Sequence, residues 1–414
     1  MHDTTARLDR DPSDASRPSA TPGAAVGAAG APDIGPPHRM LQLGIRWFTE
    51  TAGGAARYYY HLVAELAAMG VDVRGLVLGS QAAARETDGR ITAFADDGVP
   101  FLRRMRAVRR DVRRLTHELQ PELIASHFAM FAFPAIDLIR RYPYVVHFHG
   151  PWAAEARVEG AGRLSVLYKR AMEAVVYREA GRFIVLSDAF RRILVDDYHV
   201  REDRVRIVPG GVDAGRFACR ESPAEARAAL GWPSDRPIVL TARRLAQRMG
   251  LGNLIEAMAE VRRQVPDALL LIAGKGSQRA ALEAQVASLD LADHVRFLGF
   301  VADDMLPLAY RGSDLTIMPT LALEGFGLAA VEALAAGTPV LVTPVGGLPE
   351  VVRDLDPGLI LEGHRPADIA RGLSHALRAP SSLPSAERCA DFARRTYDWP
   401  IIADRVRAVY REVL

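Results

Sequence analysis

The sequence contains little cysteine and no long apolar run. Only Cys219 and Cys389 occur among 414 residues, which argues against a disulfide framework and against a zinc site built from cysteines. No apolar stretch approaches the roughly 20 residues that a membrane-spanning helix needs. The formal net charge is only +2, so the overall charge gives no indication of a nucleic-acid partner.

The first 37 residues are mostly Ala, Gly, Pro, Ser and Asp, with almost no large apolar side chains, and we expect a disordered tail there. A signal peptide needs a basic start and then an apolar core of about 7–15 residues. Residues 24–31 are too weakly apolar and too rich in glycine to form that core. We therefore expect a cytoplasmic protein.

From residue 39 onward, short apolar segments alternate with helical patterns. Buried strands that alternate with helices predict parallel sheets covered on both faces, hence an α/β fold. Residues 222–223 and 232–237 form a Pro-rich connection near the middle of the chain, which predicts two Rossmann-like domains with a cleft between them. The predicted strands cover residues 40–45, 71–78, 123–126, 144–148, 183–186, 205–208, 237–241, 269–273, 295–298, 315–318 and 339–342.

The most informative stretch runs from Glu324 to Glu332, where two glutamates eight positions apart enclose two glycines. The glycines lead into a predicted helix at 328–336, whose first-turn amides have no intrahelical acceptor and can bind an anion. Glu332, inside the helix, can accept hydrogen bonds from a pair of sugar hydroxyls. Such a site suits a nucleoside diphosphate, although a glycine-rich turn before an Ala-rich helix is also common in α/β proteins.

Residues 40–414 resemble the retaining glycosyltransferases of family 4, which have the two-domain GT-B fold. The resemblance rests on five segments that occur in this order in the sequence: Val208-Pro209-Gly210-Gly211-Val212-Asp213, Leu271-Ile272-Ala273-Gly274-Lys275-Gly276, Phe297-Leu298-Gly299-Phe300-Val301, Glu324-Gly325-Phe326-Gly327 with Glu332, and Gly346-Gly347-Leu348-Pro349-Glu350.

The resemblance also suggests how the chain divides. An N-terminal acceptor domain would cover 38–208, and a nucleotide-sugar-binding domain would cover 209–396. The last segment, 397–414, would be a helix that crosses back to the first domain, with Trp399 as a packing anchor.

For the donor, the resemblance assigns the ribose hydroxyls to Glu332 and places Glu324 beside the transferred sugar. The backbone amides of Phe326, Gly327 and Leu328 would bind the diphosphate or the hydroxyls of that sugar. Arg244 would neutralise the leaving diphosphate.

The remaining positions follow from other segments of the same resemblance. Gly53 and Gly54 would form the first-domain loop that approaches phosphate and acceptor, and His149 would touch the transferred sugar. The base would be read by the backbone near Phe300 and Val301. Independently of the resemblance, Lys275 lies next to Gly274 in a Gly-x-Gly turn between a predicted strand and helix, so it would either contact an anion or the base edge or be a solvated loop lysine.

The sequence departs from the family pattern in one loop. Met249 stands where the family usually has a lysine, and Arg243 stands where it usually has a glycine. Arg248 is a candidate for the missing charge.

The resemblance implies no cofactor, because the nucleotide-diphosphate sugar is a co-substrate. Asp354-Leu355-Asp356 has the Asp-x-Asp pattern of metal sites in the other glycosyltransferase fold, but it precedes Pro357-Gly358, and we interpret it as a turn. We find no His, Cys or carboxylate cluster at metal-ligand spacing and predict no essential metal.

Residues 101–119 form a predicted amphipathic helix in which seven arginines and one aspartate fall between residues 102 and 114. The helix either packs on the first-domain sheet with a solvated basic face, or it docks on an anionic membrane near a lipid-linked acceptor. In the second case the protein would be peripheral at the inner face of the membrane.

We therefore predict a metal-independent retaining glycosyltransferase that transfers a sugar from a nucleotide-diphosphate donor to an acceptor hydroxyl with an α linkage. A GT-B sugar-nucleotide epimerase and a non-catalytic nucleotide-sugar-binding scaffold are the alternatives. A nicotinamide oxidoreductase is disfavoured, because Thr51-Ala52-Gly53-Gly54 lacks the Gly-x-Gly-x-x-Gly pattern. The base, the sugar and the acceptor, whether a glycan, a glycolipid or a small metabolite, stay open.

Overall fold

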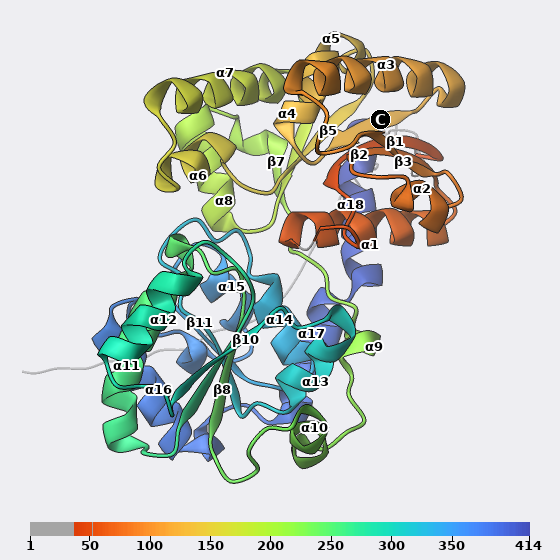
Figure 1. Ribbon diagram of the computed structural model, residues 1–414. Helices are drawn as coiled ribbons and strands as arrows, with labels where there is room; N and C mark the ends of the chain where they lie inside the picture. Colours follow the sequence, from red (N-terminus) through yellow and green to blue (C-terminus); the bar gives the residue numbers. More distant parts are fainter. Residues whose placement is uncertain (1–36, 52) are drawn as a thin grey trace, which may run out of the picture. The chain divides into compact units, whose positions relative to one another are not determined.

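The computed structural model describes residues 37–51 and 53–414, so the tail predicted at 1–37 lies almost wholly outside the described residues. Two parallel sheets and the helices around them make up these residues (Figure 1). None of the helices in the described ranges is long and apolar enough to cross a membrane.

The first sheet contains seven parallel strands within the described residues, in the order β3-β2-β1-β4-β5-β6-β7. Their bounds are β1 (Arg39–Arg46), β2 (Asp72–Leu78), β3 (Ile91–Ala95), β4 (Leu123–Ser126), β5 (Tyr144–Phe148), β6 (Arg182–Val185) and β7 (Val205–Ile207). The second sheet contains five parallel strands, in the order β10-β9-β8-β11-β12. They are β8 (Ile238–Ala242), β9 (Leu269–Ala273), β10 (Val295–Gly299), β11 (Leu315–Met318) and β12 (Val340–Val342).

Helices join most successive strands, as parallel pairing requires. Those of the first half are α1 (Gly54–Ala68), α2 (Ala82–Glu86), α3 (Phe101–Leu119), α4 (Ala129–Ala132), α5 (Ile136–Ile139), α6 (Trp152–Val158), α7 (Arg163–Glu179) and α8 (Asp188–Arg192). Those of the second half are α9 (Ala214–Phe217), α10 (Pro223–Leu230), α11 (Leu251–Gln264), α12 (Arg279–Ser288), α13 (Leu306–Arg311), α14 (Leu328–Ala335), α15 (Leu348–Val352), α16 (Pro366–Arg378), α17 (Ala386–Tyr397) and α18 (Trp399–Arg411).

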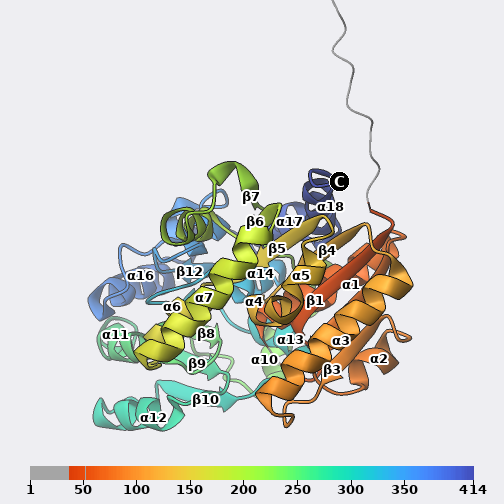
Figure 2. The same cartoon turned by 90° about the horizontal axis from the view of Figure 1, so that it is seen from above.

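Buried apolar side chains form one core on each face of the first sheet, because successive residues of a strand point to opposite faces. Val108 of α3 and Val176 of α7 belong to one core, and Leu62 of α1 and Val406 of α18 belong to the other. Figure 2 shows α3 and α7 on the same side of this sheet.

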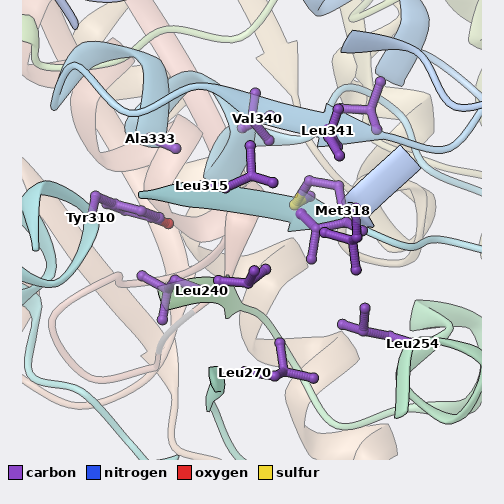
Figure 3. Close-up of a cluster of buried hydrophobic side chains, with 14 of the residues drawn as sticks. Leu240, Leu254, Leu270, Tyr310, Leu315, Met318, Ala333, Val340 and Leu341 are labelled. Atoms are coloured by element: carbon purple, nitrogen blue, oxygen red, sulfur yellow. The ribbon is translucent and has the colours of Figure 1, made fainter. Parts of the chain in front are cut away.

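A single buried cluster surrounds the second sheet. Figure 3 shows part of it, with Leu240, Leu270 and Leu315 from three neighbouring strands and Tyr310 from α13. Tyr310 is fully buried and lies close to the candidate site described below.

The last helix, α18, packs on α1 and on β6 of the first sheet (Figure 1). The chain enters and leaves the second sheet through two adjacent segments. The Val212 amide donates to the Tyr397 carbonyl at 2.8 Å, and the Trp399 amide donates to the Val212 carbonyl at 3.1 Å. Trp399 is buried and closes against Gly211, as expected of a packing anchor.

The predicted α/β fold with parallel sheets is confirmed, and two details differ. The edge strand β3 was not predicted, because its Ile91–Ala95 segment contains few large apolar residues and pairs only with β2. The connection at 222–237 contains a helix, α10, started by a capping box in which Ser222 and Glu225 exchange hydrogen bonds. The domain limits drawn from the sequence stay a prediction.

Candidate active site

Two helix N-termini lie next to each other. Helix α14 begins after Gly327 and helix α1 begins after Gly53, and neither start has a side-chain cap. A Cβ on Gly54 would lie 3.5 Å from Leu328 Cδ1, so the two starts are neighbours. Uncapped first-turn amides and the positive ends of two helix dipoles favour an anion at this place.

The glycine at the start of α14 is required by its backbone. Gly327 has φ 95°, and a Cβ there would lie 2.5 Å from Leu348 Cδ2. This geometry brings Phe326, Gly327 and Leu328, the three predicted amide donors, into one turn at the helix start.

Three arginines follow the carboxyl end of β8, and they differ in their surroundings. Arg244 is exposed and forms no ion pair with any residue in 37–51 or 53–414, so its guanidinium can bind a ligand anion. Arg248 is buried, donates to the Leu323 carbonyl at 2.9 Å, and lies 3.7 Å from Glu155 of α6. Arg243 donates to Glu324 Oε2 at 2.8 Å.

Glu332 is buried in α14 and accepts a hydrogen bond from the Tyr310 hydroxyl at 3.1 Å. Its Oε1 lies 3.4 Å from Arg57 Nη1. Burial raises the pKa of Glu332 above its usual value, although Arg57 and the Tyr310 hydrogen bond act to lower it. A carboxylate in this setting is a strong hydrogen-bond acceptor, as the proposed ribose ligand must be.

Arg57 connects Glu332 to a small charged network that the sequence did not reveal. Its guanidinium pairs with Asp303, which also pairs with Arg216, and it lies 4.3 Å from the centre of the Phe48 ring. Burial alone would lower the pKa of Arg57, but Glu332 and Asp303 together raise it. The only signal in the sequence was the position of Arg57, three residues after Gly54 in the predicted glycine loop.

Three histidines stack on one face of the first sheet. The ring centres of His127 and His147 lie 4.2 Å apart and those of His127 and His149 lie 5.2 Å apart, as expected if His149 shares a face with His147 and not with Phe148. His147 hydrogen-bonds to the buried Tyr410 hydroxyl at 2.7 Å. His127 and His147 are therefore buried parts of the core, and the half-buried His149 lies at its edge.

Hydrogen bonding sets the tautomer of His149. Gln42 Oε1 can only accept, so His127 donates to it from Nε2 across 3.0 Å, which leaves His127 Nδ1 to accept from His149 Nε2 at 3.0 Å. Burial lowers the pKa of His149 to about 4. At neutral pH its Nδ1 is thus a hydrogen-bond acceptor, suited to a sugar hydroxyl.

The predicted base-binding residues form an exposed platform. The ammonium of Lys275 lies 5.2 Å from the centre of the Phe300 ring, and Phe300 is 57% exposed. Val301 is half-buried beside it. The turn needs Gly274, because a Cβ there would lie 1.9 Å from the Arg243 carbonyl oxygen. An aromatic ring with a neighbouring cation can stack on a nucleobase.

Two further residues have structural roles. Glu350 accepts from the amides of Asp188 and Ala189 at 2.9 and 3.3 Å and so caps α8. The Asp356 side chain accepts from the Gly358 amide at 2.8 Å, which is the predicted turn. No group of three or more His, Cys, Asp or Glu residues within the described ranges is arranged to hold a metal ion.

Comparison with known families decides the class of this protein. Residues 52–216 match the model of Glycosyltransferase Family 4, and residues 223–398 match that of the glycosyl transferases group 1. The chain belongs to this family. The predicted resemblance is confirmed, and the glycosyltransferase is an enzyme that transfers sugars.

The glycosyltransferase is also similar to individual proteins. It is 35% identical over 251 residues to the D-inositol 3-phosphate glycosyltransferase of Acidothermus cellulolyticus, a match that covers 58% of this chain and 55% of that protein. The chain thus spans about half the length of this relative.

Among solved structures, the sucrose-phosphate synthase of Thermosynechococcus elongatus superposes with a TM-score of 0.78 at 22% identity, covering 91% of this chain and 98% of that one. Anabaena HepE in complex with UDP and glucose superposes with a TM-score of 0.73 at 22% identity, covering 91% and 100%. The predicted GT-B fold is therefore confirmed.

Proposed function

We propose that this glycosyltransferase moves a sugar from a nucleoside-diphosphate donor to an acceptor hydroxyl with retention, forming an α linkage without a metal ion. The observation that carries the proposal is the meeting of two uncapped helix N-termini at Gly54 and Leu328. Arg244, which follows β8, is exposed and has no ion pair within the described residues, so it is available to the same anion. These groups can bind a diphosphate, and Glu332 can accept hydrogen bonds from the ribose.

The positive groups of the site would act on the leaving diphosphate. Negative charge develops there as the glycosidic bond breaks, and preorganised donors stabilise that charge more than they stabilise the substrate. Arg244 can hold two phosphate oxygens in a fixed fork. Losing one such donor typically raises the barrier by about 3 kcal/mol, or roughly a hundredfold in rate. Arginine and helix amides would thus supply the charge that a metal supplies elsewhere.

The acceptor proton would leave through the donor itself. His149 already donates its Nε2 proton to His127, and its low pKa makes it a weak base. A phosphate oxygen of the departing diphosphate lies on the same face as the incoming hydroxyl and can take the proton. His149 and Glu324 would then orient the transferred sugar.

Similar proteins suggest which substrates to test first. HepE has been solved with UDP and glucose, and one relative acts on D-inositol 3-phosphate. UDP-sugars and inositol phosphates are therefore first in the panel, followed by GDP- and ADP-sugars and by glycan and glycolipid acceptors.

The test measures nucleotide release from each sugar nucleotide, with EDTA present, for the wild type and for Glu332→Gln. Glu173→Gln is a matched control, because Glu173 is another buried glutamate that accepts from a tyrosine, Tyr198, at 2.7 Å. We expect release from one donor, lost in Glu332→Gln and kept in the control. Retention is read from the anomeric configuration of the product.

Other outcomes would point to the alternatives. A converted sugar nucleotide without release would indicate an epimerase. Calorimetric binding of a nucleotide with no release, even with every acceptor of the panel, would indicate a scaffold. Release that EDTA abolishes would overturn metal independence.

We also propose that α3 brings the enzyme to an anionic membrane surface. Helix α3 buries Val108 and Val112 and exposes Arg103, Arg106 and Arg113. These three exposed arginines have no ion pair within the described part of the chain. Helix α7, on the same side of the sheet, exposes three large hydrophobic side chains, Leu164, Leu167 and Tyr168. Basic and apolar groups on one side suit a lipid surface.

The membrane proposal is tested by sedimentation with vesicles of phosphatidylcholine and phosphatidylglycerol. A variant with Gln at the three exposed arginines of α3 should lose binding. A control variant with Gln at three exposed arginines of the second half should keep it; these are Arg371, Arg394 and Arg395. Equal binding by both variants would overturn the proposal.

A further inference from the structure

Arg243 is a buried arginine at the centre of the candidate site. It directly follows β8, and its side chain is only 5% exposed. Nη2 donates to Glu324 Oε2 at 2.8 Å, and Thr320 Oγ1 donates to the same oxygen at 3.3 Å. Glu324 is therefore held on two sides, and Arg243 supplies the charge that holds it.

Most of this guanidinium lacks a protein partner. Nε and Nη1 of Arg243 are buried and donate to no partner within the described residues. A buried charged group with unpaired N–H donors is costly for the fold, so its retention calls for a compensating interaction. Oxygen atoms of a bound diphosphate or sugar would satisfy those donors. Helix α14, whose N-terminus is the proposed diphosphate site, begins at Leu328, four residues after Glu324.

The guanidinium of Arg243 lies against the side chain of Met249. Nη2 of Arg243 is 2.9 Å from Met249 Sδ. In lysine the ammonium nitrogen lies two atoms beyond the position of the methionine sulfur, so a lysine at 249 is long enough for its ammonium to reach the place that Arg243 Nη2 now occupies. The two departures from the family pattern, at 243 and at 249, thus meet at one point in space.

Arg248, the candidate from the sequence, has other partners. It donates to the Leu323 carbonyl, and its second nitrogen faces Glu155 on α6. Leu323 has a positive φ of 53°, so the hydrogen bond from Arg248 supports a strained backbone position just before Glu324. The guanidinium of Arg248 therefore binds the backbone of its neighbouring loop and Glu155.

We propose that Arg243, and not Arg248, supplies the second positive charge of the donor site, replacing a cation at position 249 and holding Glu324 in place beside the sugar. The inference rests on the proposed function. It concerns two residues of this chain that act together. Nucleotide binding should therefore be weakened when Arg243 alone is replaced and retained when both residues are exchanged.

The test is calorimetric binding of UDP, GDP and ADP, followed by donor kinetics with the nucleotide that binds. The variants are Arg243→Met, Met249→Lys, and the double variant Arg243→Gly/Met249→Lys. The matched control is Arg236→Met at the opposite end of β8, where Arg236 donates to the carbonyls of Asp267 and Asp293. That change should lower the melting temperature without changing nucleotide affinity.

We expect Arg243→Met to weaken nucleotide binding by about tenfold or more, the usual loss for a hydrogen bond to a charged group. Met249→Lys alone should give no gain, because two cations would share one carboxylate. The double variant should recover to within about threefold of the wild type.

Each contrary result has a separate meaning. If the wild type binds none of the nucleotides, the proposed function fails and the inference with it. If the wild type binds one and Arg243→Met binds it equally well, only the inference fails. A double variant no better than Arg243→Met, at an unchanged melting temperature, would also overturn the exchange of charge between the two positions.

Discussion

Acidification from pH 8 to pH 5 should destabilise this glycosyltransferase, because several histidines are buried in their neutral form. Burial lowers the pKa of His149 to about 4, and burial together with Arg57 lowers that of His61 to about 4. Burial also lowers the pKa values of His127 and His147. Protonation of each of these rings is less favourable in the folded state than in the unfolded state.

The sign and size of the effect follow from proton linkage. Between pH 6.5 and pH 4 the unfolded chain binds protons that the native state excludes, so stability is complete above pH 6.5 and falls as the pH approaches 4. For each histidine whose pKa drops from 6.5 to about 4 on folding, the free energy of unfolding of the protein falls by about 2 kcal/mol at pH 5 and by about 3 kcal/mol at pH 4.

Buried carboxylates act in the opposite direction, but more weakly. Burial raises the pKa values of Glu155, Glu173 and Glu332, so their contribution to stability is lost as the pH rises. At each of them a neighbouring arginine or a tyrosine hydroxyl opposes the effect of burial. The histidines should therefore dominate.

The assay is urea unfolding of the wild type and of His61→Phe between pH 5 and pH 8. His61 stacks on Trp399 with ring centres 5.4 Å apart, and a phenyl ring can keep that contact. Between pH 8 and pH 5 the variant should lose about 2 kcal/mol less than the wild type. Parallel curves for the two proteins would refute the reasoning, because they would mean that His61 titrates alike in both states.

Three other changes test the packing around the site. Arg57→Met should destabilise the fold by about 3–5 kcal/mol, because it leaves Glu332 without its buried counter-charge, and Glu332→Gln in the same chain should restore part of the loss in urea unfolding. Gly327→Ala should lower the melting temperature through a strained φ and a clash with Leu348, at a cost of about 1–3 kcal/mol. Glu350→Ala removes the cap of α8 and should cost about 1 kcal/mol in the same unfolding assay, and an unchanged midpoint would show that the cap contributes nothing.

Much of the fold could be predicted from local patterns. Four predicted strands, at 123–126, 144–148, 269–273 and 315–318, have the bounds that the structure gives them. Central strands of a parallel sheet are buried on both faces and read as continuous apolar runs between turns. The edge strand β3 lacks that signal, since one of its sides has no neighbour, and α10 was missed because its Pro223 was taken as part of a connection.

The candidate site was only partly readable. Residues that follow strands or begin helices, such as Arg244 and Gly327, could be placed because the carboxyl ends of parallel strands meet at one edge of a sheet. Their roles as ligands stay predictions. The partners of Glu332 could not be found, because Arg57 and Tyr310 come from distant elements and no spacing links them to it.

The sequence by itself determined most of the strands and helices and their order along the chain, the glycine positions at the helix starts, and the family to which the chain belongs. These depend on local backbone preferences and on short motifs. Only the tertiary structure decided which charges meet. It pairs Arg243 with Glu324 and turns Arg248 toward the backbone of its own loop. The direction of a buried side chain depends on the groups packed around it, and those come from parts of the chain that no local pattern connects.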